Sequence, residues 1–458
     1  MKLQTLSPPS RIVFPVVQGR PPYRQYALMV CLLYVSIASV LAVRIRYGVM
    51  DEDFHLSAIR AFAQGGVTRA TLYHHLPPTG VSSHIWFALW LRLFPGIDYV
   101  GLRLISCVAL GVLAVFAFSQ LASVRLSVQK TALAATLFML AFPYFFLSVS
   151  TLMTEGPSLL FLGAGLLFLF VSRFQRLLPF GLGCLLLGLT TIARFYFIPL
   201  LPTLFIVLLL SGWQQHRQHG VRADLTHRIL LYFSVAISAL PLGGLIFLWG
   251  GLTPPGFNQW SELRLGVSFN PFRPFSALAM VGIYTAPFVL LNVSWASEML
   301  SRKMLVVWLA ALSLALFRVN LFHDSLSIDT VYSGPIEHSL AWLQTKNDLL
   351  VPVGLLVLYG FGLSSLVFMT KRIMAFITDT GFSNTGLLFS VVFVSLFIIS
   401  QAFVGGNHPF YDRYLIHPWP FIGYTIASLF PRFLTPRTCL VVAGYTVLSI
   451  LILAKWGF

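Results

Sequence analysis

The sequence predicts an all-α, polytopic integral membrane protein with about 13 transmembrane helices, and three observations support this prediction. Of the 458 residues, 57% are hydrophobic and only 10% are charged. Apolar runs of about 15–22 residues recur along the chain, which is the length that a helix needs to cross a bilayer. Lys and Arg lie in twos and threes between these runs rather than together on one face. The formal charge of +16 therefore indicates positively charged cytoplasmic loops rather than a nucleic-acid partner, and the composition excludes a soluble enzyme.

The apolar runs place the expected helices, in chain order, over residues 26–43, 98–120, 131–149, 155–172, 178–193, 196–211, 228–249, 277–293, 303–318, 348–369, 387–403, 415–430 and 438–455. With the N-terminus in the cytoplasm, the groups of basic residues between runs fall on the inner side, as the positive-inside rule requires. All but three of the 14 Asp and Glu residues then fall on the outer side. Because that rule does not count acids, their concentration outside indicates chemistry on that face.

These elements are expected to form one membrane domain over residues 1–458, since no soluble domain separates them. Its other parts are a cytoplasmic tail and four external loops, at residues 1–25, 44–97, 250–276, 318–348 and 404–414. The first apolar run is expected to be a retained signal anchor rather than a cleaved signal peptide, because the polar segment before it is long and rich in proline. The four cysteines lie within apolar runs without a CxxC pair and are expected to be small core residues: Cys31, Cys107, Cys184 and Cys439.

The first external loop opens on three consecutive acids, within the block Met50–His55. Ionisable groups at a membrane edge are functional candidates, because drawing one to the centre of the bilayer costs about 2.5–3.5 kcal/mol. Asp51 takes the N-cap position of an expected amphipathic helix. The apolar stripe of that helix is expected to hold Phe54, Ala58 and Phe62. This loop is therefore predicted to be the catalytic loop of a membrane enzyme.

Further along the same loop, the helix is expected to end at Gly65-Gly66, and the segment Pro77–Gly80 is expected to form a turn. The next segment, Ile85–Phe94, is rich in Trp and Phe but too short to cross a bilayer. Such a segment predicts an interfacial helix, since aromatic rings are favoured at the membrane surface.

The other outer loops add candidate residues on the same face as Asp51, namely Glu155, Arg194, His408, Arg413 and Tyr414. Transfer of a sugar from a lipid phosphate requires this combination. The acceptor hydroxyl needs a general base, which a carboxylate provides. The departing phosphate carries a stable negative charge, so cations rather than a second acid stabilise it, whereas a glycosidase needs a paired acid and base. One base with several arginines therefore predicts in-line displacement, with inversion at the anomeric carbon of a polyprenyl-phosphate monosaccharide.

Several blocks occur in the order in which GT-C glycosyltransferases carry their motifs: Met50–His55, Pro77–Gly80, Thr154–Ser158, Arg194, His408-Pro409 and Asp412–Tyr414. The chain resembles most closely the dolichyl-phosphate-glucose alpha-1,2-glucosyltransferase family. Leu102–Ser106 and Arg413–Leu415 also resemble segments of protein O-mannosyltransferases and aminoarabinose transferases. The chain departs from the closest family at Glu155, where that family has Asp, and at Phe195–Phe197, where it has a polar block.

This resemblance implies a GT-C-like helical fold with a polyprenyl-phosphate hexose as donor and a glycan or lipid-linked acceptor. It also implies an active site on the non-cytoplasmic face. The departures from the closest family leave the sugar and the acceptor open.

The candidate acids and the nearby histidine each have an expected role and an alternative. Asp51 is the first candidate for the general base, and its alternative role is a helix cap. Glu52 is the second candidate for the base or for acceptor binding, with a solvated surface acid as the alternative. His55, one turn after Asp51, contacts the substrate or the carboxylate, or is structural. Glu155 binds the acceptor or lies near the dipole at a helix N-terminus.

The basic candidates have alternatives as well. Arg194 and Arg413 are expected to hold the leaving phosphate; the alternatives are snorkelling of Arg194 to the interface and an ion pair of Arg413 with Asp412. Arg103 binds phosphate or forms a structural salt bridge. The two remaining candidates for substrate contact are His408 and Tyr414.

No metal site and no cofactor are expected, because His74, His75 and His84 lie on a Pro-flanked segment without matching carboxylate spacing. The resemblance leaves room for a divalent cation, since some GT-C enzymes use one.

Two other functions fit this class of protein. A transporter of lipid-linked glycans would carry charged or broken elements at mid-membrane. A polysaccharide polymerase or ligase would carry one large external loop with paired arginines. The expected location is the bacterial inner membrane with a periplasmic site, or the endoplasmic reticulum in a eukaryote.

Overall fold

The structure, a computed structural model, describes residues 23–45, 48, 51–75, 79–121, 126–172, 174–219, 225–255, 269–291, 302–316, 335–347, 350–380, 384–403, 412–430 and 435–457. Every element within these ranges is an α-helix or a short 3₁₀ helix. The predicted all-helical class is confirmed for this part of the chain.

Seven helical segments in the described ranges are long and apolar enough to cross a membrane. They are α1 (Tyr23–Arg44), α8 (Glu155–Ser172), η1 with α10 (Phe195–Phe197 and Leu200–His219), α11 with α12 (Leu225–Ser238 and Leu240–Trp249), α14 (Phe272–Leu290), α18 (Leu350–Thr380) and α21 (Pro436–Gly457). Four further apolar helices are shorter over the described side chains: α5 (Tyr99–Leu121), α9 (Leu177–Ala193), α16 (Arg302–Leu316) and α19 (Thr385–Ser400). The prediction of a helical membrane protein is confirmed at this level, and the number of 13 spans stays a prediction.

Two of the expected helices are interrupted. The helix predicted over 131–149 ends at Leu140, in α6 (Leu126–Leu140), and the chain resumes helical form only in the short α7 (Phe145–Val149). Pro143 lies in the break, where its missing N–H and fixed φ disfavour a continuous helix. The helix predicted over 415–430 is divided into η3 (Asp412–Ile416) and α20 (Trp419–Leu429). At 1.5 Å per residue, the 11 residues of α20 are too few to cross a hydrocarbon core about 30 Å thick.

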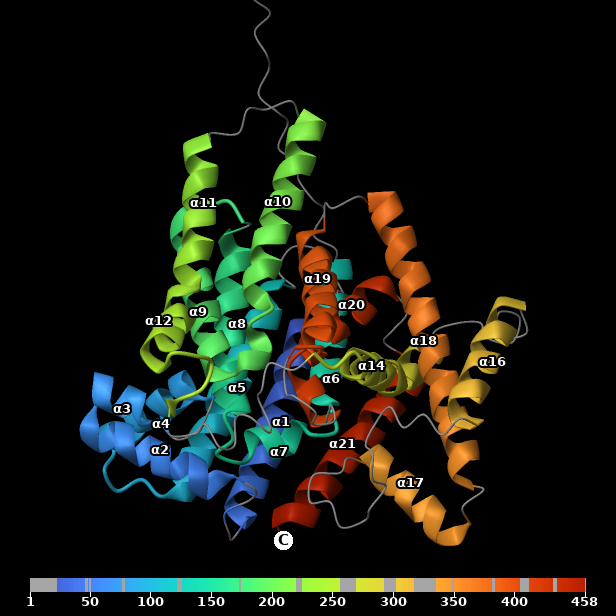
Figure 1. Cartoon of the computed structure of the whole chain (residues 1–458), viewed down its shortest axis with the longest axis horizontal. Coiled ribbons are helices and arrows are strands. Elements are labelled where there is room, and N and C mark those ends of the chain that lie inside the picture. Colours follow the sequence, from blue (N-terminus) through green and yellow to red (C-terminus); the bar gives the residue numbers. More distant parts are fainter. Residues whose placement is uncertain are drawn as a thin grey trace, which may run out of the picture.

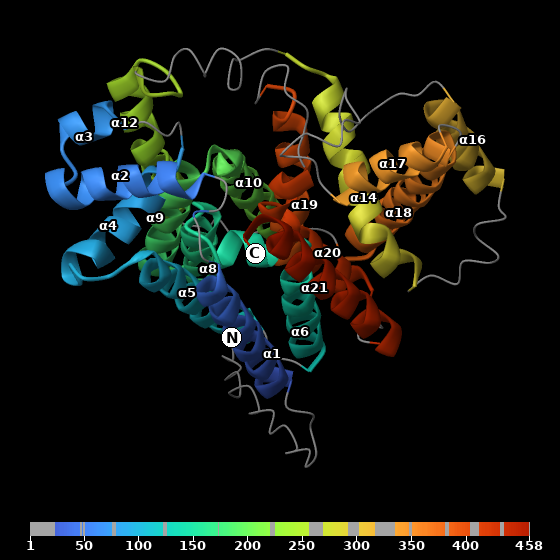
Figure 2. The same cartoon turned by 90° about the horizontal axis from the view of Figure 1, so that it is seen from below.

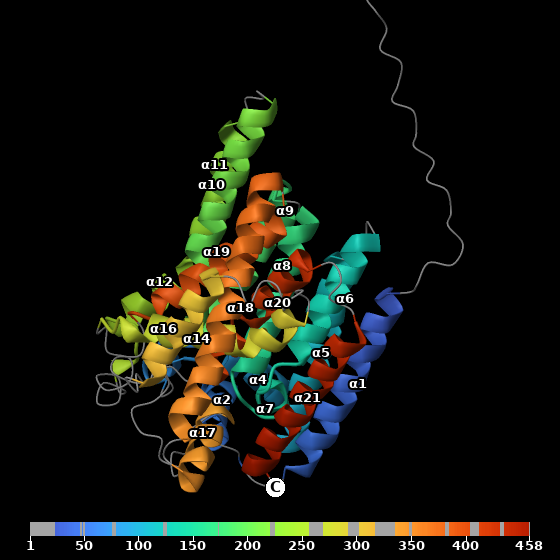
Figure 3. The same ribbon diagram turned by 90° about the vertical axis from the view of Figure 1, so that its right-hand side faces the viewer.

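The helices run mostly along one direction, and the short ones gather at one end of the bundle. Figures 1 and 3 show α2 (Glu52–Gly65), α4 (Val81–Leu93), α7 and α17 (Pro335–Lys346) at this end, here called the α2 end, and the last turn of α10 and the first turn of α11 at the opposite end. Figure 2 looks at the α2 end and shows α2, α3 (Arg69–Tyr73) and α4 beside α9 and α12. The helices α14, α16, α17 and α18 form the other flank, with α19 and α20 between the two.

Helices α8 and α9 form an antiparallel hairpin with close backbone approach. A Cβ added to Gly183 would lie 2.9 Å from the carbonyl oxygen of Gly165, so these glycines allow the two helices to meet. Because the hairpin is antiparallel, the first residue of α8 and the residue after α9 lie at the same end. This places Glu155 beside Arg194.

Helix α2 buries a different stripe from the predicted one. Ala58 and Phe62 are buried as expected, and the helix ends at Gly65 with Gly66 at φ 71°. Phe54 is 37% exposed, so its predicted place in the stripe is wrong. The buried stripe begins instead with Glu52 and His55, because this face packs against α4 and is bound by polar partners from other helices.

Helix α4 contacts α2, α5, α8 and α9. Its side facing these helices holds Ser83, His84 and Phe87, all completely buried. Leu89 and Leu93 remain exposed on the other side, which suits contact with lipid. Its location in the membrane interface stays a prediction.

Three of the four cysteines are buried as predicted. The prediction is wrong for Cys439, which is exposed near the start of α21.

Candidate active site

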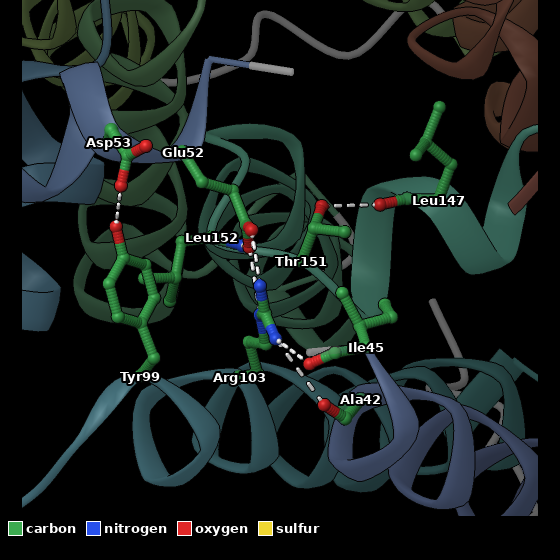
Figure 4. A network of polar contacts seen from close by, with 9 residues as sticks. All are labelled: Ala42, Ile45, Glu52, Asp53, Tyr99, Arg103, Leu147, Thr151 and Leu152. Atoms are coloured by element: carbon green, nitrogen blue, oxygen red, sulfur yellow. Dashed lines mark hydrogen bonds and ion pairs between the residues drawn. The ribbon is translucent and has the colours of Figure 1, made fainter. Parts of the chain in front are cut away.

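The three consecutive acids at the start of α2 have three different environments. Asp51 is half-buried at the N-cap position, Glu52 is completely buried, and Asp53 is exposed. Tyr99 donates a hydrogen bond from its hydroxyl to Asp53. Figure 4 shows Glu52 turned toward Arg103, while Asp53 points to Tyr99. The sequence alone does not predict these different environments, because the three acids are chemically similar and adjacent in the chain.

Glu52 and Arg103 form a buried ion pair with side chains 0% and 2% exposed. Arg103 donates from Nε to Oε1 of Glu52 at 2.9 Å and from Nη2 to Oε2. The backbone N–H of Leu152 donates to the same Oε1 at 2.6 Å, and Arg103 Nη1 donates to the carbonyl of Ile45 at 2.9 Å. The pair therefore joins the end of α1 to α2, α5 and the segment after α7, which is the structural alternative predicted for Arg103 (Figure 4). The alternative predicted for Glu52, a solvated surface acid, is wrong. Its role as a base stays a prediction.

Asp51 differs from Glu52 because its side chain makes no capping hydrogen bond. Although Asp51 takes the predicted N-cap position, its carboxylate does not cap the helix through a hydrogen bond, so this form of its alternative role is wrong. Its backbone carbonyl accepts from the N–H of His55 at 3.0 Å, so the two residues lie one turn apart on the same face of α2. The charge of Asp51 acts on both His55 and Arg413, a cation from a distant segment.

Glu155 and Arg194 form an ion pair at the ends of α8 and α9, with side chains 6% and 13% exposed. Arg194 Nη1 also donates to the hydroxyl of Thr79 at 3.4 Å. Atoms Oε2 of Glu155 and Nε of Arg194 are buried without a hydrogen-bond partner among the described residues. Glu155 also lies in the first turn of its helix, so both roles predicted for it remain compatible with its position.

The residue that follows Thr79 is Gly80. Its φ is 95°, in the left-handed region that side chains rarely adopt. A Cβ there would lie 2.6 Å from Cγ2 of Thr154 and 2.8 Å from Cε1 of His84. Half of the predicted turn lies outside the described residues and the turn stays a prediction, but Gly80 permits close packing against the site.

Arg413 and Tyr414 reach the site from η3. The guanidinium of Arg413 lies 5.4 Å from the centre of the Tyr414 ring. Burial opposes the charge of Arg413, but the hydroxyl of Tyr414 and the carboxylates of Glu155 and Asp51 outweigh it and raise its pKa. Conversely, burial would raise the pKa of Tyr414, but the charge of Arg413 and hydrogen bonds lower it. His408 and the side chain of Asp412 lie outside the described residues.

Three residues near this cluster were not predicted: Tyr196, Arg273 and His417. The ring of Tyr196 lies 4.5 Å from that of Tyr414 and 5.1 Å from that of His417, centre to centre. Arg273 is 3% exposed and its charge acts on Tyr196. Arg273 lies in the predicted external segment 250–276. Arg194 and Arg413 were chosen because they are basic residues on the outer side, and the same criterion applies to Arg273.

His417 has a defined tautomer. Its Nδ1 lies 2.8 Å from the carbonyl oxygen of Tyr414, which only accepts, so Nδ1 carries the hydrogen. Its Nε2 is then an acceptor, and this atom is buried without a partner in the described part of the chain. The charges of Glu155 and Arg194 both act on this ring, so His417 borders the same cluster.

Three histidines lie in series behind the cluster. His55 Nδ1 is 3.0 Å from His84 Nε2, and His84 Nδ1 is 2.9 Å from His75 Nε2. Burial and the charge of Arg194 lower the pKa of His55 to about 4, and burial with the neighbouring histidines lowers the pKa of His84 well below its usual value. In the described residues no three His, Cys, Asp or Glu side chains are arranged to hold a metal ion. The predicted absence of a metal stays a prediction.

The site therefore combines two carboxylates with cationic guanidinium groups, held on α2, α8, the end of α9 and η3. Of the predicted residues, Asp51, His55, Glu155, Arg194, Arg413 and Tyr414 belong to one electrostatic cluster, whereas Glu52 and Arg103 face each other beside it. Such a cluster can bind an anion at its arginines and accept a proton at a carboxylate. Comparison with known proteins adds no family to this geometry: no protein-family model, no curated protein and no solved structure matches the chain.

Proposed function

We propose that this protein is a GT-C-type inverting glycosyltransferase, which moves a hexose from a polyprenyl-phosphate donor to a hydroxyl of a glycan or lipid-linked acceptor. The observation that carries the proposal is the ion pair of Glu155 with Arg194, near Arg413, on which the charges of both Glu155 and Asp51 act. These four side chains come from segments far apart in the sequence and meet at the α2 end. A carboxylate beside partly buried arginines supplies the two functions that this transfer requires, a base and a group of cations that binds phosphate.

The donor phosphate is assigned to Arg194 and Arg413. Guanidinium groups bind phosphate oxygens with paired, charge-assisted hydrogen bonds. Glu155 orients Arg194 by binding Nη2 and leaves its Nε without a partner among the described residues. The arginines stabilise the negative charge that moves onto the polyprenyl phosphate as the bond to the sugar breaks.

The general base is assigned to Asp51 rather than Glu52. Both oxygens of Glu52 are held by Arg103, and one also accepts from Leu152. Asp51 is half-buried and has no capping bond to hold its side chain. It takes the proton of the acceptor hydroxyl while the acceptor oxygen attacks the anomeric carbon from the face opposite the phosphate.

The apolar helices position this chemistry at a membrane, where the prenyl chain of the donor would remain in lipid. The distribution of basic residues in the sequence assigns the α2 end to the non-cytoplasmic side. That side is the periplasm if the chain is bacterial and the lumen of the endoplasmic reticulum if it is eukaryotic. The proposal includes no cofactor, and a requirement for a divalent cation is to be measured directly.

The test supplies purified protein in lipid with a set of radiolabelled polyprenyl-phosphate hexoses and a mixture of glycan and lipid-linked acceptors. We expect transfer of label from one of these donors and a loss of about 10²-fold or more in Asp51→Asn. Asp53→Asn is the matched control, because Asp53 is an exposed acid two residues away and should leave transfer unchanged.

Full turnover by Asp51→Asn would remove Asp51 as the base. Absence of transfer from every donor would overturn the proposed function. Movement of an intact lipid-linked sugar between leaflets, without a new glycosidic bond, would show transport instead.

A further inference from the structure

Three imidazole rings form a buried series that begins beside the proposed active site. His55 lies on α2, His84 in the first turn of α4, and His75 in the segment after α3. Their ring nitrogens are joined at 3.0 Å and 2.9 Å, and the ring centres are 5.1 Å apart at each step. His84 is completely buried and uses both ring nitrogens in the series, while the outer two rings are 5% and 4% exposed.

The inner end of the series lies beside the proposed base. His55 follows Asp51 by one helical turn, and the charges of Asp51, Glu155, Arg194 and Arg413 all act on its ring. Because Nδ1 of His55 is bound to His84, its Nε2 is the nitrogen left to exchange a proton with the cluster.

The outer end is itself buried, since His75 is only 4% exposed, but it adjoins an exposed residue. His75 is bordered by the rings of Phe62 and Trp249, at 5.4 Å and 6.4 Å between centres. Its neighbour His74 is exposed. His75 is therefore one residue along the chain from the surface.

A neutral imidazole donates at one nitrogen and accepts at the other, so three in series carry a proton by successive transfers. The two arginines and the burial oppose a lasting positive charge on His55, whereas Asp51 and Glu155 favour it. His84 faces the two other histidines and Arg194, which all disfavour its protonation. These surroundings favour neutral rings at rest.

We propose that His55, His84 and His75 form a proton relay, which conducts the proton collected by Asp51 to the surface beside His74. This inference rests on the proposed function. As the acceptor O–H bond breaks and the new bond to the anomeric carbon forms, the proton moves to Asp51 and the electron pair of the broken sugar–phosphate bond leaves with the polyprenyl phosphate. The proton then passes to Nε2 of His55, from Nδ1 of His55 to Nε2 of His84, and from Nδ1 of His84 to Nε2 of His75. The proton on Nδ1 of His75, which is buried in the structure, is released to water when this ring turns toward the surface beside His74.

The relay restores Asp51 to its charged form. A purely structural series would also stabilise the contact between α2 and α4, so a loss of stability does not distinguish the two roles. Proton conduction does distinguish them, because it makes turnover sensitive to deuterium and to external buffer when the relay is broken.

The main test is His84→Gln, whose amide nitrogen keeps a hydrogen bond but cannot pass a proton along. We expect the turnover number for sugar transfer to fall about tenfold, less than the loss expected for the base itself, with the KM for the donor unchanged. We also expect a larger solvent deuterium isotope effect and partial recovery at high concentrations of imidazole buffer. The matched control is His74→Gln, an exposed histidine outside the series, which should behave as the unmodified protein.

If His84→Gln does not fold, His75→Gln interrupts the same series at its outer end, with the same expected results. The relay is wrong if the folded variant keeps the turnover number, or loses activity without any change in isotope effect or buffer dependence. Either result leaves sugar transfer by the unmodified protein, and hence the proposed function, intact.

If the unmodified protein transfers no sugar, the proposed function fails and the relay is tested without turnover. Nitrogen-15 NMR of labelled histidines in lipid should show hydrogen-bonded, exchanging ring nitrogens for His55, His84 and His75. The His84→Gln substitution should shift the signals of the other two rings. Independent, non-exchanging signals would overturn the relay in this case as well.

Discussion

Glu155 and Arg194 are 39 positions apart in the sequence and form an ion pair that is incompletely satisfied. One oxygen of Glu155 and the Nε of Arg194 are buried without a hydrogen-bond partner among the described residues. An unsatisfied buried polar atom is unfavourable by about 1–3 kcal/mol, and such groups concentrate where a ligand completes the bonds. The pair is therefore suited to hold a ligand rather than only to join α8 to α9.

Replacing Arg194 by Lys tests whether its planar group binds the donor. A lysine keeps the charge but loses the fork that binds both a carboxylate and a phosphate. We expect kcat/KM for the polyprenyl-phosphate donor to fall by about 10–100-fold, the equivalent of about 1.5–3 kcal/mol for a charged hydrogen bond. Arg176→Lys, at the exposed opposite end of α9, is the control. Equal kinetics in the two variants would exclude Arg194 from donor binding.

The buried pair of Glu52 and Arg103 should matter for stability. Arg103→Met leaves the carboxylate of Glu52 without its cation, and loss of one partner of a buried pair costs about 3–5 kcal/mol. The double variant Glu52→Gln with Arg103→Met removes both charges and should recover most of that loss. Thermal unfolding in detergent compares the stability of the unmodified protein, the single variant and the double variant. A single variant as stable as the unmodified protein would contradict this structural role.

The pH dependence of stability should reflect His55. Its pKa in the folded protein is about 4, below the unfolded value near 6.5, because of burial and the charge of Arg194. The unfolded chain therefore binds the proton first as the pH falls, so the stabilising contribution is complete above about pH 6.5 and is lost progressively toward pH 4. Unfolding temperatures measured at about pH 7 and about pH 5 should differ more in the unmodified protein than in His55→Gln. The same difference in both proteins would exclude His55 as the source.

Two glycines of α8 should respond in opposite ways to alanine. A Cβ on Gly156 would overlap Oγ of Ser106, so Gly156→Ala should destabilise the protein by roughly 1–3 kcal/mol. A Cβ on Gly163 meets no atom within 4 Å, so Gly163→Ala should stabilise the helix by up to about 1 kcal/mol. Unfolding measured in the same detergent compares the two. Similar effects at both positions would contradict the packing of α5 against α8.

Much of the fold was predictable because helix formation in a membrane is a local property. Each predicted apolar segment overlaps a helix, since length and hydrophobicity alone decide which segments satisfy their backbone within lipid. The prediction of one continuous helix over 131–149 was wrong because it followed the hydrophobicity of the segment and ignored the helix-breaking Pro143. Phe54 was placed on the wrong face because an apolar stripe was assumed for a helix whose buried face begins with Glu52 and His55.

By itself, the sequence determined that the chain is a helical membrane protein and that polar candidates cluster beyond its first span. Composition and periodicity carry that information, because they depend on neighbours along the chain. Only the tertiary structure decided that Glu52 binds Arg103, that Glu155 binds Arg194, and that His84 joins two other histidines. These partners are set by how the helices pack, and side-chain pairing across distant helices leaves no periodic signal in a single sequence.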